Sequence, residues 1–137
     1  MTSPVELARV TDPDILPHIR GHLEEIASSS GLFTAVSLAA DLVAGRKQLW
    51  AGASPTLGLE FVGLTEMVNH INGRTLDLIA CVGEGRDRWM DKIEVVERFA
   101  VANGCRRIRA FSRPGWRRDL VRRGFRHSHD ILEMDLG

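Results

Sequence analysis

Hydrophobic residues in the first third of the chain recur mainly at helical spacing. A short alternating run, "VELARV" at residues 5–10, first predicts a strand. "TDPD" then starts a helix, because Pro13 suits a first helical turn and Thr11 or Asp12 can cap it. A second helix is predicted over residues 34–44 and stops at Gly45. The apolar positions are Ile15, Ile19, Leu23 and Ile26 in the first helix and Val36, Ala39, Ala40 and Val43 in the second.

The middle of the chain changes to short runs that are typical of strands. "QLWAGA", "LGLEFVG", "TEMVNHI" and "TLDLIACV" are rich in β-branched and large apolar residues. The pair Asn72-Gly73 is a strong hairpin signal between the last two runs. These runs predict an antiparallel meander. Residues 76–82 are apolar on both faces apart from Asp77, so this strand is expected at the centre of the sheet.

The last third alternates helices with strands. A helix is predicted over residues 87–103, with Gly104 as its stop and one apolar stripe. "RRIRAF" is the next strand, and it should run parallel to residues 76–82 because a helix connects the two. "PGWRRDLVRRG" predicts a short helix and "FRHSHDILEMDL" a last strand. The helical stripe consists of Trp89, Ile93, Val96 and Ala100, with Phe99 beside it.

This element order predicts an α/β fold. It has a mixed central sheet with an antiparallel N-terminal meander, flanked by about four helices. The 137 residues are expected to form one domain, residues 1–137, and 44% hydrophobic residues are enough for a core. No repeat, linker or low-complexity segment interrupts the pattern.

Charge is balanced overall but uneven along the chain. Eighteen basic and 18 acidic residues give a formal net charge of zero, so binding to nucleic acid or membrane is not expected. The stretch from Arg106 to Arg126 nevertheless holds nine arginines. This arginine-rich face could bind a phosphate group or an acidic protein partner, or it could be a solvated surface.

Other features of the composition favour a cytoplasmic protein without a metal. Two cysteines, Cys81 and Cys105, are too few for a disulfide framework, and no apolar run is long enough to span a bilayer. His127 and His129 share one face of the predicted last strand, but no third ligand has suitable spacing. We therefore expect no metal site.

The second half of the chain carries a family resemblance. From about Leu76 onward it has a central strand, a loop, a long helix ending in "ANGC", a strand, a short helix and "RRGF" before the final strand. This order resembles the GNAT N-acetyltransferase superfamily, and the first half matches it by element order. The stretches "EGRDRW", "GCRRI" and "SRPGW" also resemble small GNAT-like proteins encoded by phages and prophages, which implies a virion location as an alternative to the cytoplasm.

The GNAT resemblance implies acetyl-CoA as a cofactor. It would lie where the central strand and its parallel neighbour separate, with its pyrophosphate at the start of the helix after the loop. The loop here departs from the family pattern, since Glu84 stands where Arg or Gln is usual, and Asp87 and Trp89 stand where its two small residues are usual. Only Gly85 survives, at a position where glycine is common but not required. Trp89 is expected in the core. The residues implied in cofactor binding are Ile79, Cys81, Gly83, Gly85, Arg86, Asp87 and Arg88.

The resemblance also implies transfer of an acetyl group to an amine, carried by a small molecule or a protein. Backbone N–H groups around residues 79–81 would assist attack on the thioester. The tyrosine that many GNAT enzymes use as general acid falls on Leu120, and the chain contains no tyrosine. Glu60, Glu66 and Asp77 are candidates for the general base. The alternative is a GNAT fold without catalysis, acting as a binding or structural protein such as a phage component.

Overall fold

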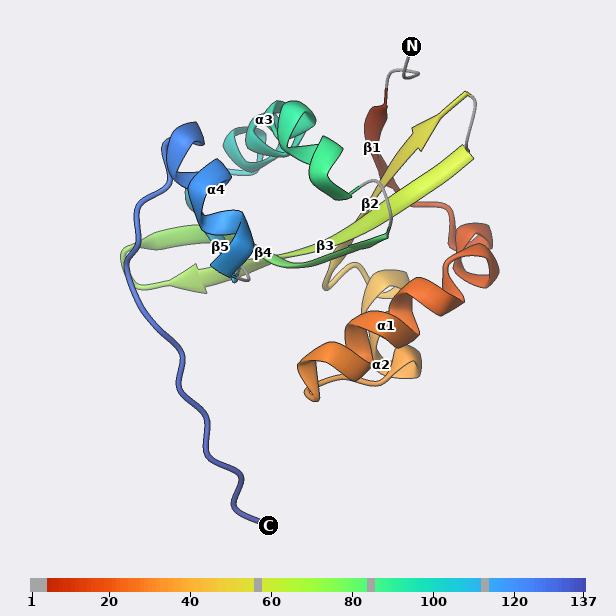
Figure 1. Ribbon diagram of the computed structural model, residues 1–137, viewed down its shortest axis with the longest axis horizontal. Coiled ribbons are helices and arrows are strands. Elements are labelled where there is room, and N and C mark those ends of the chain that lie inside the picture. Colours follow the sequence, from red (N-terminus) through yellow and green to blue (C-terminus); the bar gives the residue numbers. More distant parts are fainter. Residues whose placement is uncertain (1–4, 56–57, 84–85, 112–113) are drawn as a thin grey trace.

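A mixed five-stranded sheet runs through the described residues, which are 5–55, 58–83, 86–111 and 114–137 of the computed structural model (Figure 1). Its strands lie side by side in chain order. The first four are antiparallel, and the fifth is parallel to the fourth. This arrangement confirms the predicted fold class. The strands are β1 (Glu6–Val10), β2 (Gln48–Ser54), β3 (Gly58–His70), β4 (Gly73–Gly83) and β5 (Cys105–Ala110).

Helices cover both faces of the sheet (Figure 1). The first pair of α-helices lies on one face and the second pair on the other. In chain order, the helical segments are η1 (Pro13–His18), α1 (Arg20–Ser30), α2 (Ala35–Val43), η2 (Arg86–Lys92), α3 (Glu94–Ala102), η3 (Pro114–Trp116) and α4 (Arg117–Arg123), where η marks a 3₁₀ helix.

Two hydrophobic clusters, one on each face, hold these layers together. Neighbouring strand residues point to opposite faces, so Phe61 packs in the cluster with η2 and α3, while Val62 packs in the cluster with α1 and α2. The central strands are covered on both faces, which explains why they read as nearly continuous apolar runs. The predicted stripe of Trp89, Ile93 and Val96 is buried, as is Ala100, so the expected core position of Trp89 is confirmed. The helix predicted over residues 87–103 is divided into η2 and α3.

The meander contains fewer and longer strands than the sequence suggested. Residues 58–63 and 65–70, which were predicted as parts of two separate runs, belong to one strand, β3, which continues through a register shift at Leu64/Thr65. A β-bulge of this kind inserts an unpaired residue without ending the strand. The predicted hairpin is confirmed, but its two-residue turn is Ile71-Asn72, one residue earlier than expected, because His70 pairs with Gly73 across it.

The buried face of α2 differs from the predicted stripe. Val36 and Val43 are 80% and 67% exposed, whereas Leu38 is fully buried. Both faces of this short helix carry apolar side chains, and the leucine face buries more surface per residue. Of the predicted stripe, Ala39 does lie on the buried face. The face that packs in the cluster shared by α1 and the sheet consists of Ala35, Leu38, Ala39 and Leu42.

The predicted last strand is wrong. Residues 125–137, called the tail here, are extended but pair with no described strand. Residues 126–137 are all exposed. An alternating sequence is not sufficient for a strand, because the backbone also needs a neighbour to accept its hydrogen bonds.

No single helix among the described residues is long and apolar enough to cross a membrane. The pair α1 and α2 reaches the required length and composition only when taken together, and the two helices are bent by 116° at their junction.

Gly83, at the end of β4, provides a test of the packing between β3 and β4. Its φ angle is +123°, and a Cβ there would lie 2.4 Å from the Glu60 carbonyl oxygen and 2.6 Å from the Phe61 Cα. We expect Gly83→Ala to lower the free energy of unfolding by about 3 kcal/mol, from backbone strain together with overpacking, measured by urea titration.

Gly104→Ala is the matched control, since Gly104 also has positive φ (+72°) but open space around its Cα. It should cost only the strain, about 1–2 kcal/mol. Equal losses in the two variants would contradict the close packing at Gly83.

Candidate functional site

The site is formed where β4 and β5 stop pairing. Residues 74–78 of β4 are in register with residues 105–110 of β5, and the Phe111 N–H donates to the Leu78 carbonyl at 3.1 Å. Beyond Leu78, β4 continues to Gly83, whereas β5 ends at Ala110. The two parallel strands therefore separate, as predicted for the central strand and its neighbour.

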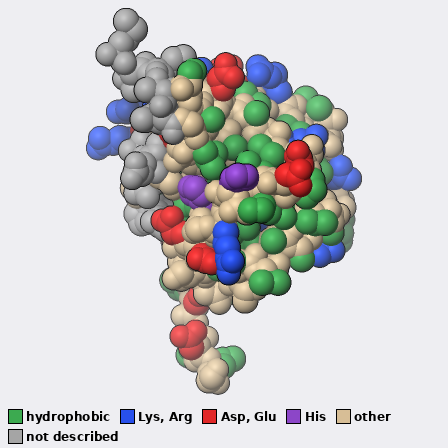
Figure 2. All heavy atoms as spheres, turned by 90° about the vertical axis from the view of Figure 1, so that its right-hand side faces the viewer, with side chains coloured by type: hydrophobic (Ala, Val, Ile, Leu, Met, Phe, Trp, Pro, Cys, Tyr) green, Lys and Arg blue, Asp and Glu red, His purple; other side chains and the backbone are tan. Residues whose placement is uncertain are grey.

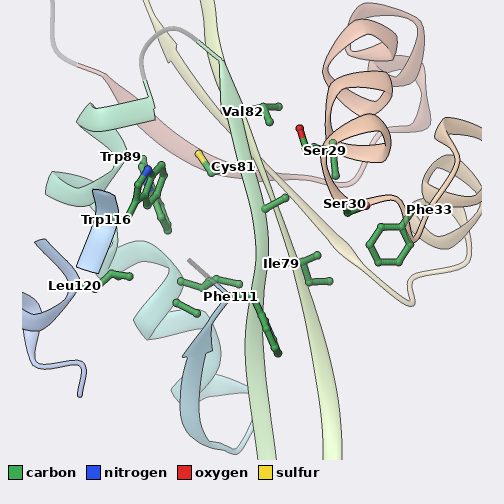
Figure 3. Close-up of a pocket in the computed structure, with 14 residues that line it drawn as sticks. Ser29, Ser30, Phe33, Ile79, Cys81, Val82, Trp89, Phe111, Trp116 and Leu120 are labelled. Carbon is green, nitrogen blue, oxygen red and sulfur yellow. The ribbon is translucent and has the colours of Figure 1, made fainter. Parts of the chain in front are cut away.

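A cleft of about 210 Å³ lies at this separation (Figure 3). Figure 3 shows that it reaches both sides of β4, with Cys81 pointing toward Trp89 and Ile79 toward the end of α1. Its walls are mostly apolar, and none of the described residues that line it is Asp, Glu, Lys, Arg or His. The lining residues are Ile26, Ser29, Ser30, Phe33, Leu78–Val82, Trp89, Ala110, Phe111, Trp116 and Leu120.

A bulge in β4 lies within the cleft. On β3, Leu64 pairs with Ala80 and Thr65 with Leu78, so the register skips Ile79. The pairing with β5 already ends at Leu78, and Ile79 has no paired residue on either neighbouring strand in the described ladders. The strand is therefore irregular at the segment whose backbone was predicted to assist acyl transfer.

Two tryptophans form one wall of the cleft. The ring centroids of Trp89 and Trp116 are 5.3 Å apart, with their planes tilted by 44°. Trp89 is 7% exposed, and its Nε1 atom is buried without a hydrogen-bond partner in the described structure. An unpaired buried donor costs about 1–3 kcal/mol, so this N–H could be satisfied by a bound polar group.

The predicted acids do not line the cleft. Glu60 accepts a hydrogen bond from Arg88 Nη1 at 2.7 Å, and Asp77 accepts one from Arg109 Nε at 2.8 Å. Glu66 lies 4.0 Å from the Lys47 ammonium and is more exposed. Two of the three carboxylates are thus held in close ion pairs, and a base role for any of them stays a prediction.

Asp77 is nearly buried at 4% exposure, and it organises several polar groups. The Thr75 hydroxyl donates to Asp77 Oδ1 at 2.9 Å, and Arg109 binds both carboxylate oxygens. The hydrogen bond to Asp77 raises the pKa of Arg109 above its ordinary value, so the guanidinium stays charged. This pair joins β4 to β5 just before the two strands separate.

The residues implied in cofactor binding are distributed unevenly. Ile79 and Cys81 line the cleft, and Gly83 ends β4 beside it. Arg88 pairs with Glu60. Gly85 lies outside the described residues. Arg86 and Asp87 belong to η2, but their side chains are likewise outside the described part.

The cleft residues at the end of α1 were not predicted from the sequence. Ser29 and Ser30 line the cleft together with Phe33, and none of the three was named as a candidate. Gly31 ends α1 with φ of +69°, as expected of a C-cap glycine. The only signal in the sequence was a cluster of hydroxyls at a helix end, and this feature alone does not indicate a site. Leu120, the position implied for the family tyrosine, is 4% exposed and lines the cleft.

Comparison with known proteins identifies the fold. No protein-family model and no curated protein sequence matches the chain. Among solved structures, a predicted acetyltransferase from Clostridium acetobutylicum, solved with acetyl-CoA, has a TM-score of 0.73 at 11% identity, covering 96% of both chains.

Two further structures agree with this result. AAC(6')-Iy, solved with the bisubstrate analogue CoA-S-monomethyl-acetylneamine, gives a TM-score of 0.72 at 14% identity, covering 97% of this chain and 98% of its own. Glucosamine-6-phosphate N-acetyltransferase from Arabidopsis thaliana gives 0.70 at 9% identity, covering 97% and 99%. The chain has the GNAT acetyltransferase fold.

The ion pair of Asp77 and Arg109 can be tested for its structural contribution. Asp77→Asn should lower the free energy of unfolding by about 1–3 kcal/mol, because it leaves a partly buried guanidinium without its charge partner. The expected loss is not larger because the Arg109 side chain is 43% exposed, and water screens part of its charge. Urea titration measures this loss.

Glu66→Gln is the matched control, since Glu66 is 38% exposed and distant from its cation. It should change the free energy of unfolding by less than about 0.5 kcal/mol. If Glu66→Gln lowers the free energy of unfolding as much as Asp77→Asn does, the loss in Asp77→Asn cannot be assigned to its ion pair with Arg109.

Proposed function

We propose that this protein is an acyl-CoA-dependent N-acyltransferase that uses acetyl-CoA. The observation that carries the proposal is the cleft at the separation of β4 and β5, which contains the β4 bulge at Ile79. The likeness of the fold to structures solved with acetyl-CoA or a CoA conjugate supports it.

The cleft suits the acyl end of the cofactor. A volume of about 210 Å³ is below the roughly 300–1,000 Å³ typical of sites that enclose a drug-sized ligand. It therefore fits the thioester and part of the attached arm, and the nucleotide would lie outside. The tryptophan wall and Leu120 provide an apolar surface for the arm, and the Trp89 N–H is an available donor.

The chain's contribution to the reaction would come mainly from backbone groups. Bound acetyl-CoA supplies an electrophilic thioester carbonyl. N–H groups of the bulged segment, residues 79–81, would donate to the carbonyl oxygen as negative charge develops on it. The cleft walls would exclude water and hold the acceptor amine near the carbonyl carbon.

Proton transfer would proceed without a side-chain acid in the cleft. The amine nitrogen forms the new C–N bond, the C–S bond breaks, and the amine loses a proton. A thiol has a pKa of about 8.5, so the thiolate can leave without prior protonation. Leu120 offers no hydroxyl at the position implied for the family tyrosine. We assign proton removal to a water molecule, which would carry the proton from the amine to bulk solvent.

The acceptor side of the cleft favours a small, largely apolar amine. Ile26, Phe33 and Phe111 give it apolar walls, and Ser29 and Ser30 add hydroxyls. A polycationic acceptor would need carboxylates nearby, and none of the described lining residues supplies one. One of the structural neighbours is an aminoglycoside acetyltransferase solved with sisomicin. We propose a different acceptor class for this chain.

One observation favours a second function. Leu120 lies in the cleft where the family resemblance implies a tyrosine, and the chain has no tyrosine to replace it. A GNAT fold without catalysis, serving as a binding or structural protein with a partner at the arginine-rich face, would need no such group. Such a non-catalytic protein would release no CoA from acetyl-CoA.

The cofactor proposal predicts micromolar binding of acetyl-CoA, measured by isothermal titration calorimetry. Ala110→Phe should weaken binding at least about tenfold, because Ala110 lines the cleft at the end of β5 and a phenyl ring would fill the space. Ala44→Phe adds the same ring at an exposed position and should leave binding unchanged.

Circular dichroism would confirm that both variants are folded. Acetyl-CoA binding that is undetectable at millimolar concentration in the unchanged protein would refute the cofactor proposal. Equal affinity of Ala110→Phe and Ala44→Phe for acetyl-CoA would place the cofactor outside the cleft.

The acceptor proposal predicts that a small arylalkylamine accelerates CoA release from acetyl-CoA, followed with a thiol reagent. An aminoglycoside at the same concentration should give no acceleration over acetyl-CoA alone, because its charges would enter a cleft without described carboxylates. The reverse preference would contradict the assigned acceptor class. Tight binding of acetyl-CoA with no release for any amine would favour the non-catalytic alternative.

A further inference from the structure

The end of β5 carries a row of side chains on the face of the sheet opposite to α3. Ile108 and Ala110 pack against the hydrophobic cluster that contains α3. Because successive side chains of a strand point to opposite faces, Arg107 and Arg109 lie on the other face, and both are exposed. The Arg109 guanidinium lies over the ring of Phe111, 5.6 Å from its centroid, so Phe111 continues the row.

This row of side chains begins at the cleft. Phe111 lines the cleft wall, and the ladder with β4 sets Arg109 and Arg107 opposite the positions two and four residues before Ile79. At about 3.3 Å per residue, the two arginines stand about 7 and 13 Å along the strands from Ile79. Ile79 points toward the end of α1, on the acceptor side of the cleft (Figure 3). The positive charges therefore lie directly outside that side of the cleft.

A bulge in β5 sets Arg107 in this row. The pairing with β4 shifts between Cys105 and Arg107, so Arg106 has no residue opposite it, and its Nη1 atom donates to the Asn72 carbonyl at 2.7 Å. Because of the extra residue, Cys105 and Ile108 both pack against the cluster although they are three positions apart. Bulges that re-aim a side chain in this way are common beside active sites.

Arg107 carries a charge that its cross-strand neighbours do not neutralise. Arg109 is matched by Asp77, which accepts hydrogen bonds from its Nε and Nη2 atoms and leaves its Nη1 atom without a partner in the described structure. Arg107 is level with Thr75 and Val68 across the sheet, and neither is acidic. Its guanidinium forms no ion pair or hydrogen bond with the described part of the chain. Five donor N–H groups are therefore open to a ligand.

The position of this charge distinguishes it from the rest of the surface. Figure 2 shows the side of the molecule away from β5 in Figure 1, and there acidic and basic side chains lie scattered among hydrophobic ones. The described residues that line the cleft are neutral, so a cation beside it adds a selective contact. An arginine elsewhere would be an ordinary surface residue, whereas Arg107 can reach the outer end of an acceptor held in the cleft.

We propose that Arg107, assisted by the Nη1 group of Arg109, binds a carboxylate at the far end of the acceptor, so that the substrate is an arylalkylamine that also carries a carboxylate. This inference rests on the acyltransferase function proposed above. The amine would enter the neutral cleft near Ile79, the aromatic ring would pack on Phe111, and the carboxylate would stay outside. A guanidinium binds a carboxylate through two parallel hydrogen bonds. Asp77 neutralises Arg109, and the single remaining charge matches a monoanion better than a doubly charged phosphate.

The test begins with calorimetric titration of 4-(2-aminoethyl)benzoate into the full chain. It should bind at least about tenfold more tightly than 4-(2-aminoethyl)benzamide, which has the same ring and amine but no negative charge. Arg107→Gln should remove this difference, and Arg107→Lys, which keeps the charge, should retain part of it. Arg98→Gln changes an exposed arginine on α3, across the sheet, and should leave both affinities unchanged. Circular dichroism would check that each variant is folded.

CoA release from acetyl-CoA separates this inference from the proposed function. Arg107→Gln should raise KM for the benzoate at least about tenfold with kcat unchanged, because it removes a contact made equally in the ground state and the transition state. No benzoate binding at millimolar concentration, equal binding of the two amines, or a benzoate affinity that survives Arg107→Gln would each overturn the carboxylate subsite. Binding that depends on Arg107 without any CoA release would support the subsite and refute the transferase function instead.

Discussion

The end of pairing between β4 and β5 at Leu78 is the constraint on which the rest of the structure depends. A helical crossover makes β5 parallel to β4, and the chain leaves the sheet after Ala110 while β4 continues. The space that opens is bounded by η2 and α4 on one face and the end of α1 on the other. Every feature assigned to function, from the bulge at Ile79 to the tryptophan wall, lies around this separation.

The charged residues near the cleft strengthen its framework and leave its lining neutral. Asp77 and Arg109 join the two strands where they are still paired, and Glu60 binds Arg88 between β3 and the segment after β4. Carboxylates held in this way are not available to neutralise a cationic ligand inside the cleft. The proposed apolar acceptor and the use of backbone donors both follow from this distribution of charge.

The sequence alone was sufficient to predict an element where turn residues or the spacing of apolar residues depend directly on the local backbone geometry. The hairpin between β3 and β4, the parallel β5 and the buried stripe through Trp89 were predicted, because turn residues and helical period are local signals. The buried face of α2 was not, because both sides of the helix are apolar and only tertiary packing selects Leu38. The tail was predicted as a strand from its alternation, which specifies faces but not a partner. The cleft serines and the bulge depend on contacts between distant segments, and no local pattern encodes them.

The central claim is that the separated part of β4 receives the thioester. Backbone NMR of the labelled protein, recorded with and without acetyl-CoA, tests it most directly. The account predicts that the amide resonances of residues 79–81 shift and gain protection from hydrogen exchange, since their N–H groups would donate to the bound carbonyl. Shifts confined to the arginine-rich face, with residues 79–81 unchanged, would contradict it.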